Sequence, residues 1–286
     1  MERIVHLVPE VTDPGNRGPS RGMFCLQNLL RARALSWLKI GGNVMRPGEI
    51  PWFWMFRECR LNIAEWHWSG QRFIIGPNVL FLDSRKPCQH PWERTILESP
   101  GCVLLFTESC WYERLIREHQ KPACKAEIVV WPYPVSPEPE GPILMEHDLL
   151  IYVKSGADGQ VICELQRQFP FHATFIYGTY NRDEMIHAAR RASCCVYLSD
   201  DDRMPIAASE IALAGCPLIG IERGCPHTKL GLGVEIEALT LDAIQAAILK
   251  AQAMKREEVR ATAQRVFDPQ AIVDTVIAAL DKARRN

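Results

Sequence analysis

The second half of the sequence alternates between short apolar runs and segments with helical periodicity. The apolar runs lie at 148–153, 172–177, 194–198 and 217–221. Segments with helical periodicity intervene at 158–168, 182–192 and 207–214. Continuous apolar strands that alternate with helices are typical of a parallel sheet whose two faces are covered. The pattern therefore predicts an α/β domain in this half of the chain.

Five prolines crowd the stretch from Pro132 to Pro142, PYPVSPEPEGP. Each proline lacks a backbone N–H and fixes φ, which excludes a regular helix or a central strand. We interpret the stretch as a semi-rigid, extended linker. Because 286 residues are enough for two domains, we expect one domain at 1–131 and a second at 143–286, joined by a linker at 132–142.

The first half of the sequence is less regular but also predicts an α/β domain. Strands are expected at 3–8, 79–83, 102–106 and 127–131, and helices at 22–38 and 109–119. The segment 51–68 interrupts this pattern with four tryptophans. Such a cluster is more often part of a core, although aromatic faces also line sites that bind sugars or bases. The sequence leaves both interpretations open.

The end of the chain is predicted to be helical, in two segments that are separated near Asp268 and Pro269. Asp268 suits the N-cap of the final helix, and Pro269 suits its first turn.

Composition excludes several classes of function. Lysine and arginine total 33 against 34 acidic residues, so the chain lacks the basic excess of a protein that binds nucleic acid. No apolar run approaches the roughly 20 residues of a transmembrane helix. The eleven cysteines form no C-x-x-C pair, and several lie inside apolar runs. They favour buried thiols over a metal or redox role, and a reducing, cytoplasmic location.

The segment 199–221, SDDDRMPIAASEIALAGCPLIGI, suits an anion-binding site. An acidic loop follows a predicted strand, Pro205 opens a helix and Gly215 closes it. The N-terminus of such a helix carries free N–H groups and the positive end of the helix dipole. Asp202 and Glu210 flank this N-terminus, with seven residues between them. A diphosphate at the helix start and a ribose diol at Glu210 would both find partners here.

The same residues also allow a structural interpretation. Asp200, Asp201 and Asp202 can cap the helix, because acidic side chains stabilise its first turn. Glu210 can be a solvated helix residue. Since strand–loop–helix units occur in many folds, the local pattern alone does not choose between the two interpretations.

The segment resembles the signature of retaining GT-B glycosyltransferases, in which Glu-x7-Glu precedes a small-residue helix and a Gly-x-Pro-(Val/Leu)-Ile strand. This chain has Asp202-x7-Glu210, followed by Gly215-Cys216-Pro217-Leu218-Ile219. The resemblance covers residues 145–285 and extends only weakly into the first half. It departs from the family in two places. Asp202 replaces the first glutamate, and Met204-Pro205 stands where the family has glycines.

The resemblance implies two Rossmann-like domains of the GT-B type that face a cleft, with a C-terminal helix packing back. The first domain would bind the acceptor and the second the nucleotide sugar. In the second domain, the implied donor-binding residues are Lys154, Asp202, Arg203, Ile206 and Glu210. In the first domain, they belong to a glycine-containing loop over 14–24 and are Gly18, Arg21 and Gly22. A surface lysine and a mobile surface loop are the alternatives for Lys154 and for this loop.

The implied reaction moves a hexosyl or related sugar from a nucleoside-diphosphate donor to a hydroxyl group, with retention of configuration. The helix N-terminus and Lys154 would stabilise the departing diphosphate without a metal or a further cofactor. The acceptor is not identified and could be a glycan, a lipid, a protein or a modified nucleobase. One alternative is a catalytically weak relative that binds a nucleotide or a glycan, which Pro205 favours because proline offers no N–H. A dinucleotide-dependent oxidoreductase is disfavoured, because no Gly-x-Gly-x-x-Gly follows a strand.

Overall fold

The computed structural model describes residues 3–8, 10–12, 18–41, 46–54, 70–77, 79–80, 82, 91–135, 145–156 and 158–286. The chain divides into two compact units, each built on one parallel sheet. Unit 1 comprises Met1–Pro134 with Pro269–Asn286, and unit 2 comprises Val135–Asp268. The prediction of two α/β domains with parallel sheets is confirmed. Within the described ranges, no helix combines the length and the apolar character that crossing a membrane requires.

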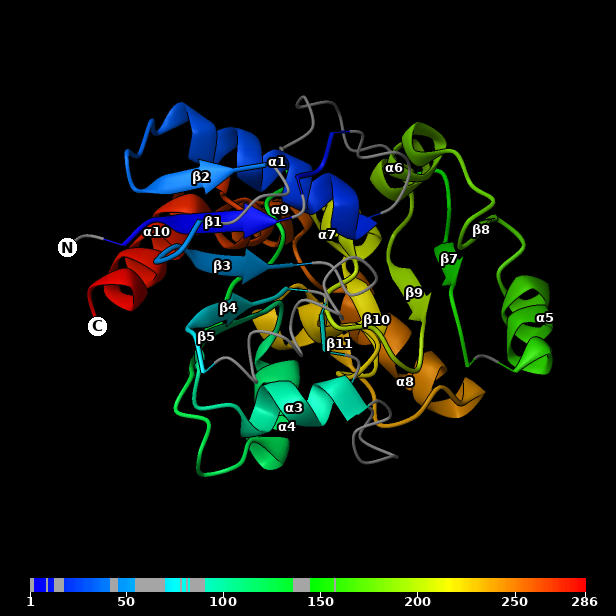
Figure 1. The fold of residues 1–286 in the computed structure, drawn as a ribbon. Helices are drawn as coiled ribbons and strands as arrows, with labels where there is room; N and C mark the ends of the chain where they lie inside the picture. The colour runs from blue at the N-terminus through cyan, green and yellow to red at the C-terminus, as the bar shows by residue number, and fades with distance from the viewer. Residues whose placement is uncertain are drawn as a thin grey trace. The chain divides into compact units, whose positions relative to one another are not determined.

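Unit 1 is built on a six-stranded parallel sheet in the order β2-β1-β3-β4-β5-β6 (Figure 1). In chain order its strands are β1 (Val5–Val8), β2 (Leu38–Ile40), β3 (Ile50–Phe53), β4 (Phe73–Ile75), β5 (Cys102–Thr107) and β6 (Glu127–Val130). Its described helices before the linker are α1 (Gly18–Ala32), α3 (Pro91–Glu98) and α4 (Cys110–His119). The strands β1, β5 and β6 and the helix α4 confirm the expectations for 3–8, 102–106, 127–131 and 109–119.

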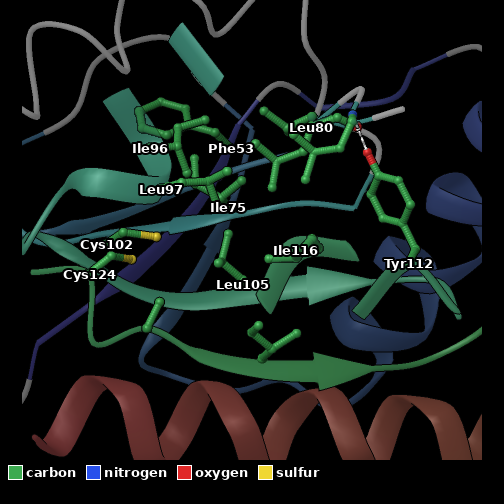
Figure 2. Packing of buried hydrophobic residues seen from close by; sticks show 14 of the residues in the cluster. Phe53, Ile75, Leu80, Ile96, Leu97, Cys102, Leu105, Tyr112, Ile116 and Cys124 are labelled. Atoms are coloured by element: carbon green, nitrogen blue, oxygen red, sulfur yellow. Dashed lines mark hydrogen bonds between the residues drawn. The ribbon is translucent and has the colours of Figure 1, made fainter. Parts of the chain in front are cut away.

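The predicted strand at 79–83 is wrong for the residues that the structure describes. Val79, Leu80 and Leu82 are buried, but their backbone is not in a strand. The Tyr112 hydroxyl accepts a hydrogen bond from Leu82 N (2.7 Å) and donates one to Leu80 O (2.8 Å), as Figure 2 shows in part. A side chain therefore satisfies backbone groups that a strand would pair with a neighbour.

The first half also contains elements that the sequence did not predict. The helix expected at 22–38 ends at Ala32, and residues 38–40 form the edge strand β2. The strand β3 lies in the aromatic segment and contains Pro51, although proline is rare inside a sheet. Trp52 and Trp54 are buried, so the part of 51–68 that is described belongs to the core. The remaining residues of that segment, 55–68, lie outside the described residues.

Unit 2 is built on a five-stranded parallel sheet in the order β11-β10-β9-β7-β8. Its strands are β7 (Leu149–Val153), β8 (His172–Ile176), β9 (Cys195–Leu198), β10 (Leu218–Gly220) and β11 (Gly233–Glu235). Its helices are α5 (Gly159–Gln168), α6 (Arg182–Arg191), α7 (Ile206–Leu213), the 3-10 helix η1 (Pro226–Leu230), α8 (Leu241–Gln252) and α9 (Arg256–Val266). Every strand and helix predicted between 148 and 221 is confirmed to within two residues, whereas β11 was not predicted.

The core of unit 2 fixes the positions of its strand ends. Leu149, Ile151 and Val196 from the sheet pack with Leu165 of α5 and Ile248 of α8. The other face carries α6 and α7, and every residue of α7 is buried. Because the strands are parallel, the loops that follow β7, β8 and β9 leave the sheet at one edge. We call this edge, with Lys154, Asp202 and the first turns of α6 and α7, the carboxyl edge.

The last helix, α10 (Pro269–Arg285), belongs to unit 1, although the sequence assigned 143–286 to one domain. It contacts α1 and β5 (Figure 1, red) and buries an apolar face. Arg33 and Asp274 form an ion pair between its start and the segment after α1. The predicted break at Asp268 and Pro269 is confirmed, and the preceding stretch contains two helices, α8 and α9. Of the expected linker, residues 132–135 form no helix or strand, and 136–142 lie outside the described residues.

Candidate functional site

The loop between β9 and α7 is held by backbone contacts with the segment after β10. The Asp202 N–H donates to Arg223 O (2.7 Å), and Arg223 Nε donates to Asp200 O (2.7 Å). Gly224 packs so closely that a Cβ there would lie 1.7 Å from Ser199 O. No larger residue fits at Gly224 without moving the loop. The acidic loop is therefore a fixed part of the carboxyl edge.

Lys154 and Asp202 form an ion pair at the carboxyl edge. Lys154 follows β7 and Asp202 follows β9, and these two strands are neighbours. The Lys154 ammonium also lies 5.1 Å from the centre of the Tyr177 ring, within the range of a cation–π contact. Burial raises the pKa of the Asp202 carboxyl above its usual range, and the Lys154 charge opposes that shift. The structure thus brings together two of the predicted site residues as partners of each other.

Glu210 forms a second ion pair, with Arg182. Arg182 Nε donates to Glu210 Oε1 (2.6 Å). The Glu210 side chain is 3% exposed and that of Arg182 is 33% exposed, so a buried carboxylate holds a guanidinium that reaches solvent. Arg182 is the first residue of α6, whose start is capped by the Asn181 side chain. The interpretation of Glu210 as a solvated helix residue is therefore wrong, because its carboxylate is buried and paired.

Sequence reasoning missed Arg182. It lies 28 residues before Glu210, and no motif links the two positions. Only the packing of α6 beside α7 brings them together. A signal was present in the topology, since β7, β8 and β9 predict that α6 and α7 begin at the same edge of the sheet.

The first turn of α7 has backbone N–H groups that could donate hydrogen bonds to a ligand. The helix begins after Pro205, which makes no side-chain cap. The first hydrogen bond of α-helical type runs from Ser209 N to Pro205 O (3.2 Å). The first N–H groups of a helix find no partner within the helix, so those of Ile206, Ala207 and Ala208 are available in this sense. Pro205, and none of the three aspartates, occupies the N-cap position of α7, and Asp202 is paired with Lys154.

A buried hydrogen bond joins α7 to the 3-10 helix η1. Ser209 Oγ lies 2.9 Å from His227 Nε2, and both side chains are buried. Burial lowers the pKa of His227 to about 3, so its imidazole is neutral at neutral pH. The His227 ring also lies 5.6 Å from that of Phe267 at the end of α9. His227 therefore positions the helix and is too deeply buried to touch a ligand.

Tyrosines surround the Lys154–Asp202 pair. The Tyr152 and Tyr197 rings stack with centroids 4.8 Å apart, and the Tyr180 ring meets Tyr152 edge-on at 5.5 Å. Burial raises the pKa of Tyr152 and Tyr197 well above the usual range, and the Asp202 charge adds to the shift. These phenols therefore stay protonated. Tyr177, by contrast, is more than half exposed at the rim.

The predicted site residues of unit 1 lie in a helix. Gly18 begins α1, and Arg21 and Gly22 lie within it, so residues 18–24 do not form the loop expected over 14–24. A Cβ at Gly22 would lie 2.3 Å from the Tyr133 ring, so close packing explains why a glycine stands at this position. Residues 14–17 lie outside the described residues.

Arg203, the remaining predicted cation of unit 2, lies beside Asp202. Its charge lowers the pKa of the Asp202 carboxyl, whereas burial raises that pKa. Among the described residues, no group of three or more His, Cys, Asp or Glu side chains is arranged to hold a metal ion.

No protein-family model and no curated protein matches this sequence. Solved structures match it over nearly its whole length. AviGT4, a glycosyltransferase involved in avilamycin A biosynthesis, is 16% identical with a TM-score of 0.56, and the match covers 99% of this chain and 98% of that one. Sucrose-phosphate synthase from Thermosynechococcus elongatus is 12% identical with a TM-score of 0.64, and 98% of each chain is covered. The chain has the GT-B fold.

A further neighbour was solved with a ligand bound. It is the trehalose-6-phosphate protein from E. coli bound with UDP-2-fluoro glucose, which is 10% identical with a TM-score of 0.59. The match covers 93% of this chain and 76% of that one. At such identities the neighbours establish the fold, and the chemistry has to be argued from the residues of this chain.

Proposed function

We propose that this protein is a glycosyltransferase that moves a sugar from a nucleoside-diphosphate donor to a hydroxyl acceptor. The observation that carries the proposal is the carboxyl edge of unit 2. There, Lys154 pairs with Asp202 in the loop that leads into α7, and Lys154 and this loop follow neighbouring strands of a GT-B fold. A cation and the positive end of a helix dipole at one point favour a diphosphate.

In this proposal, the diphosphate lies against the α7 N-terminus and takes the Lys154 ammonium from Asp202. The first-turn amides of Ile206 and Ala207 donate to phosphate oxygens. As the bond between the anomeric carbon and the diphosphate oxygen breaks, negative charge grows on the leaving group. These donors are fixed before the reaction, so they stabilise that charge without reorganising. This is also the reason to propose a reaction that needs neither a divalent metal nor a further cofactor.

Glu210 is proposed to hold the donor ribose. Arg182 fixes the position of the Glu210 carboxylate by donating to Oε1. An ionised carboxylate has about four acceptor positions, so it can hold Arg182 and still accept from a ribose hydroxyl. Arg203 is proposed as a secondary cation near the phosphates. Retention of configuration follows only from the resemblance to the retaining family, and the acceptor class stays open among glycans, lipids, proteins and modified nucleobases.

A second candidate function is a binding module with little or no transfer activity. The Lys154–Asp202 ion pair favours it, because the carboxylate neutralises the cation that the leaving group needs. Pro205 favours it too, since it removes one N–H from the start of α7. Such a module would bind a nucleotide or glycan but leave the donor intact.

Thermal unfolding with and without nucleotides tests the proposal. The diphosphates of uridine, guanosine, adenosine and thymidine are compared with the matching nucleosides. We expect at least one diphosphate to raise the Tm by several degrees and its nucleoside to raise it much less, because a ligand that binds only the folded state stabilises it. Glu210→Ala should remove the shift, whereas the exposed control Glu258→Ala should keep it. No shift with any diphosphate would overturn the transferase and the nucleotide-binding form of the second candidate.

Donor turnover then separates the two candidates. Release of nucleoside diphosphate from a sugar donor is measured with the stabilising nucleotide, in the presence and absence of a chelator. Turnover that survives chelation supports a metal-independent transferase. Binding without turnover for every sugar tested supports the binding module.

A further inference from the structure

Two cysteine side chains meet at one end of the unit 1 core. Cys102 is the first residue of β5, and Cys124 lies just before β6, which pairs with β5. Both are buried, and Figure 2 shows their sulfur atoms side by side at the edge of the apolar cluster. The two thiols are hydrogen-bonded to each other. Sequence reasoning took the cysteines as inert core residues, and nothing in the proposed function uses this pair.

The Cys124 sulfur has polar neighbours. Gln120 Nε2 donates to it (3.5 Å), and Cys102 and the Ala126 backbone also interact with it. Gln120 is itself held, because its side-chain amide also donates to Cys124 O (3.1 Å) and Ala126 O (3.2 Å). Donors of this kind stabilise a thiolate relative to a thiol. They lower the pKa of Cys124 to about 6, with the Cys102 hydrogen bond as the largest cause.

Cys102 has the opposite character. Burial raises its pKa well above the usual range, and the neighbouring Cys124 sulfur adds to the rise. The two sulfurs therefore differ in character, and Cys124 is the more readily ionised of the two. Such a pair differs from the buried cysteines of unit 2, because burial raises the pKa of Cys194, Cys195 and Cys216.

Cys124 can be reached through a small local opening. The residues Lys121, Pro122 and Ala123 before it are exposed, and so is Lys125 after it. A turn hydrogen bond from Cys124 N to Lys121 O (3.0 Å) closes this segment, and Lys121 N donates to Leu97 O (2.9 Å) at its start. Short exposed turns open at a much lower free energy than the whole domain. The two flanking lysines give the segment a positive charge that favours an anionic reagent.

We propose that Cys102 and Cys124 are a redox modification site that reacts with small-molecule disulfides such as oxidised glutathione. In the first step the Cys124 thiolate attacks one sulfur of the disulfide, which forms a mixed disulfide and releases one thiolate. In the second step Cys102 loses its proton and its sulfur attacks Cys124 Sγ, which releases the second thiolate. The protein dithiol is oxidised to a disulfide, and the reagent is reduced to two thiols.

The disulfide would join the start of β5 to the segment that enters β6. Both ends lie in unit 1, so the bond would stabilise this unit against unfolding by restricting its unfolded chain. It lies at the amino ends of the strands and leaves the carboxyl edge of unit 2 chemically unchanged. The site is therefore independent of the proposed transferase activity.

Peptide mapping of the native protein tests the site. The full-length protein is incubated with oxidised glutathione, alkylated to trap free thiols, digested and analysed by mass spectrometry. We expect a linked peptide pair containing Cys102 and Cys124, lighter by two hydrogen atoms, and its loss after treatment with dithiothreitol. Cys110 and Cys163, which are exposed, serve as internal controls that take glutathione without forming a linked pair.

Two variants sharpen the test. Cys102→Ser should trap glutathione on Cys124, because the resolving thiol is gone. Cys124→Ser should leave Cys102 unmodified. If native wild-type protein forms no linked pair while Cys110 and Cys163 are modified, the proposal is overturned. That result does not depend on the folding of any variant. The proposal is also overturned if Cys102→Ser gives a native circular dichroism spectrum but carries no glutathione adduct at Cys124.

Discussion

The two units share an architecture of helices on a parallel sheet, but they differ in which stretches of the chain complete them. Unit 2 is continuous, from Val135 to Asp268, whereas unit 1 needs the last helix of the chain to cover its sheet. Their buried hydrogen-bonded side-chain pairs also lie in different places. In unit 1 the pair of His6 and Glu49 (3.1 Å) ties β1 to the residue before β3, inside the sheet. In unit 2 the pairs Lys154–Asp202 and Arg182–Glu210 join loops and helix starts at the carboxyl edge.

This difference indicates that the pairs of the two units have different roles. Charges that lie within a sheet fix strands, and they gain nothing from a ligand. Charges at the carboxyl edge of parallel strands lie where α/β proteins bind ligands, and each can exchange its partner for a ligand group. The following predictions test whether the two units differ in stability and chemistry as this comparison requires.

Removal of residues 269–286 should have the largest effect. The helix α10 buries Ile272, Val273, Val276 and Leu280. Such side chains contribute about 1.5–3 kcal/mol each, against a total stability of about 5–15 kcal/mol for a domain. We expect hydrogen exchange to show lost protection across β1 to β6 and retained protection in β7 to β10. Deletion of Asn286 alone is the control. Equal loss in both units would contradict the separate closure of unit 1.

The next prediction concerns acid stability and His227 in unit 2. An unfolded histidine protonates near pH 6.5, whereas burial lowers the pKa of folded His227 to about 3. The stability it contributes is thus complete above pH 6.5 and is lost as the pH falls toward 3. Between pH 7 and pH 4 the loss should be about 3 kcal/mol. Urea unfolding of His227→Phe at both pH values should lack this loss, and the exposed control His187→Gln should keep it. Identical pH slopes in wild type and His227→Phe would contradict the prediction.

Breaking the Arg182–Glu210 pair should lower the free energy of unfolding by less than the preceding changes, but it should lower nucleotide affinity strongly. Glu210→Ala removes the buried carboxylate partner of Arg182, which should cost about 1–3 kcal/mol because Arg182 is partly exposed and keeps its pair with Asp183 (3.3 Å). The double variant Arg182→Met/Glu210→Ala should recover part of that stability in urea unfolding. Nucleotide affinity should stay low in both variants when measured by calorimetry. Recovery of affinity along with stability would show that Glu210 only positions α7.

The smallest expected effects come from the Lys154–Asp202 pair. Lys154→Met should weaken nucleoside-diphosphate binding by about tenfold, roughly 1.4 kcal/mol, because one charged contact is lost. Asp202→Asn keeps the size of the side chain but frees Lys154 from its partner. It should tighten diphosphate binding several-fold and leave nucleoside binding unchanged, as calorimetry can measure. Weaker diphosphate binding in Asp202→Asn would mean that Asp202 itself supports the ligand site.

Much of unit 2 could be predicted from the sequence. Its central strands are uninterrupted apolar runs such as 149–153 and 195–198, and apolar runs of that kind have few alternatives to a buried parallel strand. Alternation with helices then fixes which loops share an edge. The assignment of Lys154 and Asp202 to one site came from the resemblance to the retaining GT-B family, and the structure places the two residues in contact.

Unit 1 was predicted less well for physical reasons. The strand β3 contains Pro51, and β2 and β4 have only three residues each, so none carries a clear period. The apolar residues at 79–82 resemble a strand, but the Tyr112 hydroxyl takes their backbone hydrogen bonds. Contacts made only by folding, such as Arg182 with Glu210 and Cys102 with Cys124, leave no mark in local sequence.

The central claim is that the carboxyl edge of unit 2 binds a nucleoside diphosphate. Hydrogen–deuterium exchange of the full-length protein, with and without the diphosphate that raises the Tm most, tests it most directly. The account predicts slower exchange in two segments, residues 177–184 before and in α6 and residues 202–210 at the start of α7, with no comparable change at Cys102 or Cys124. Slower exchange elsewhere, with these two segments unchanged, would contradict it.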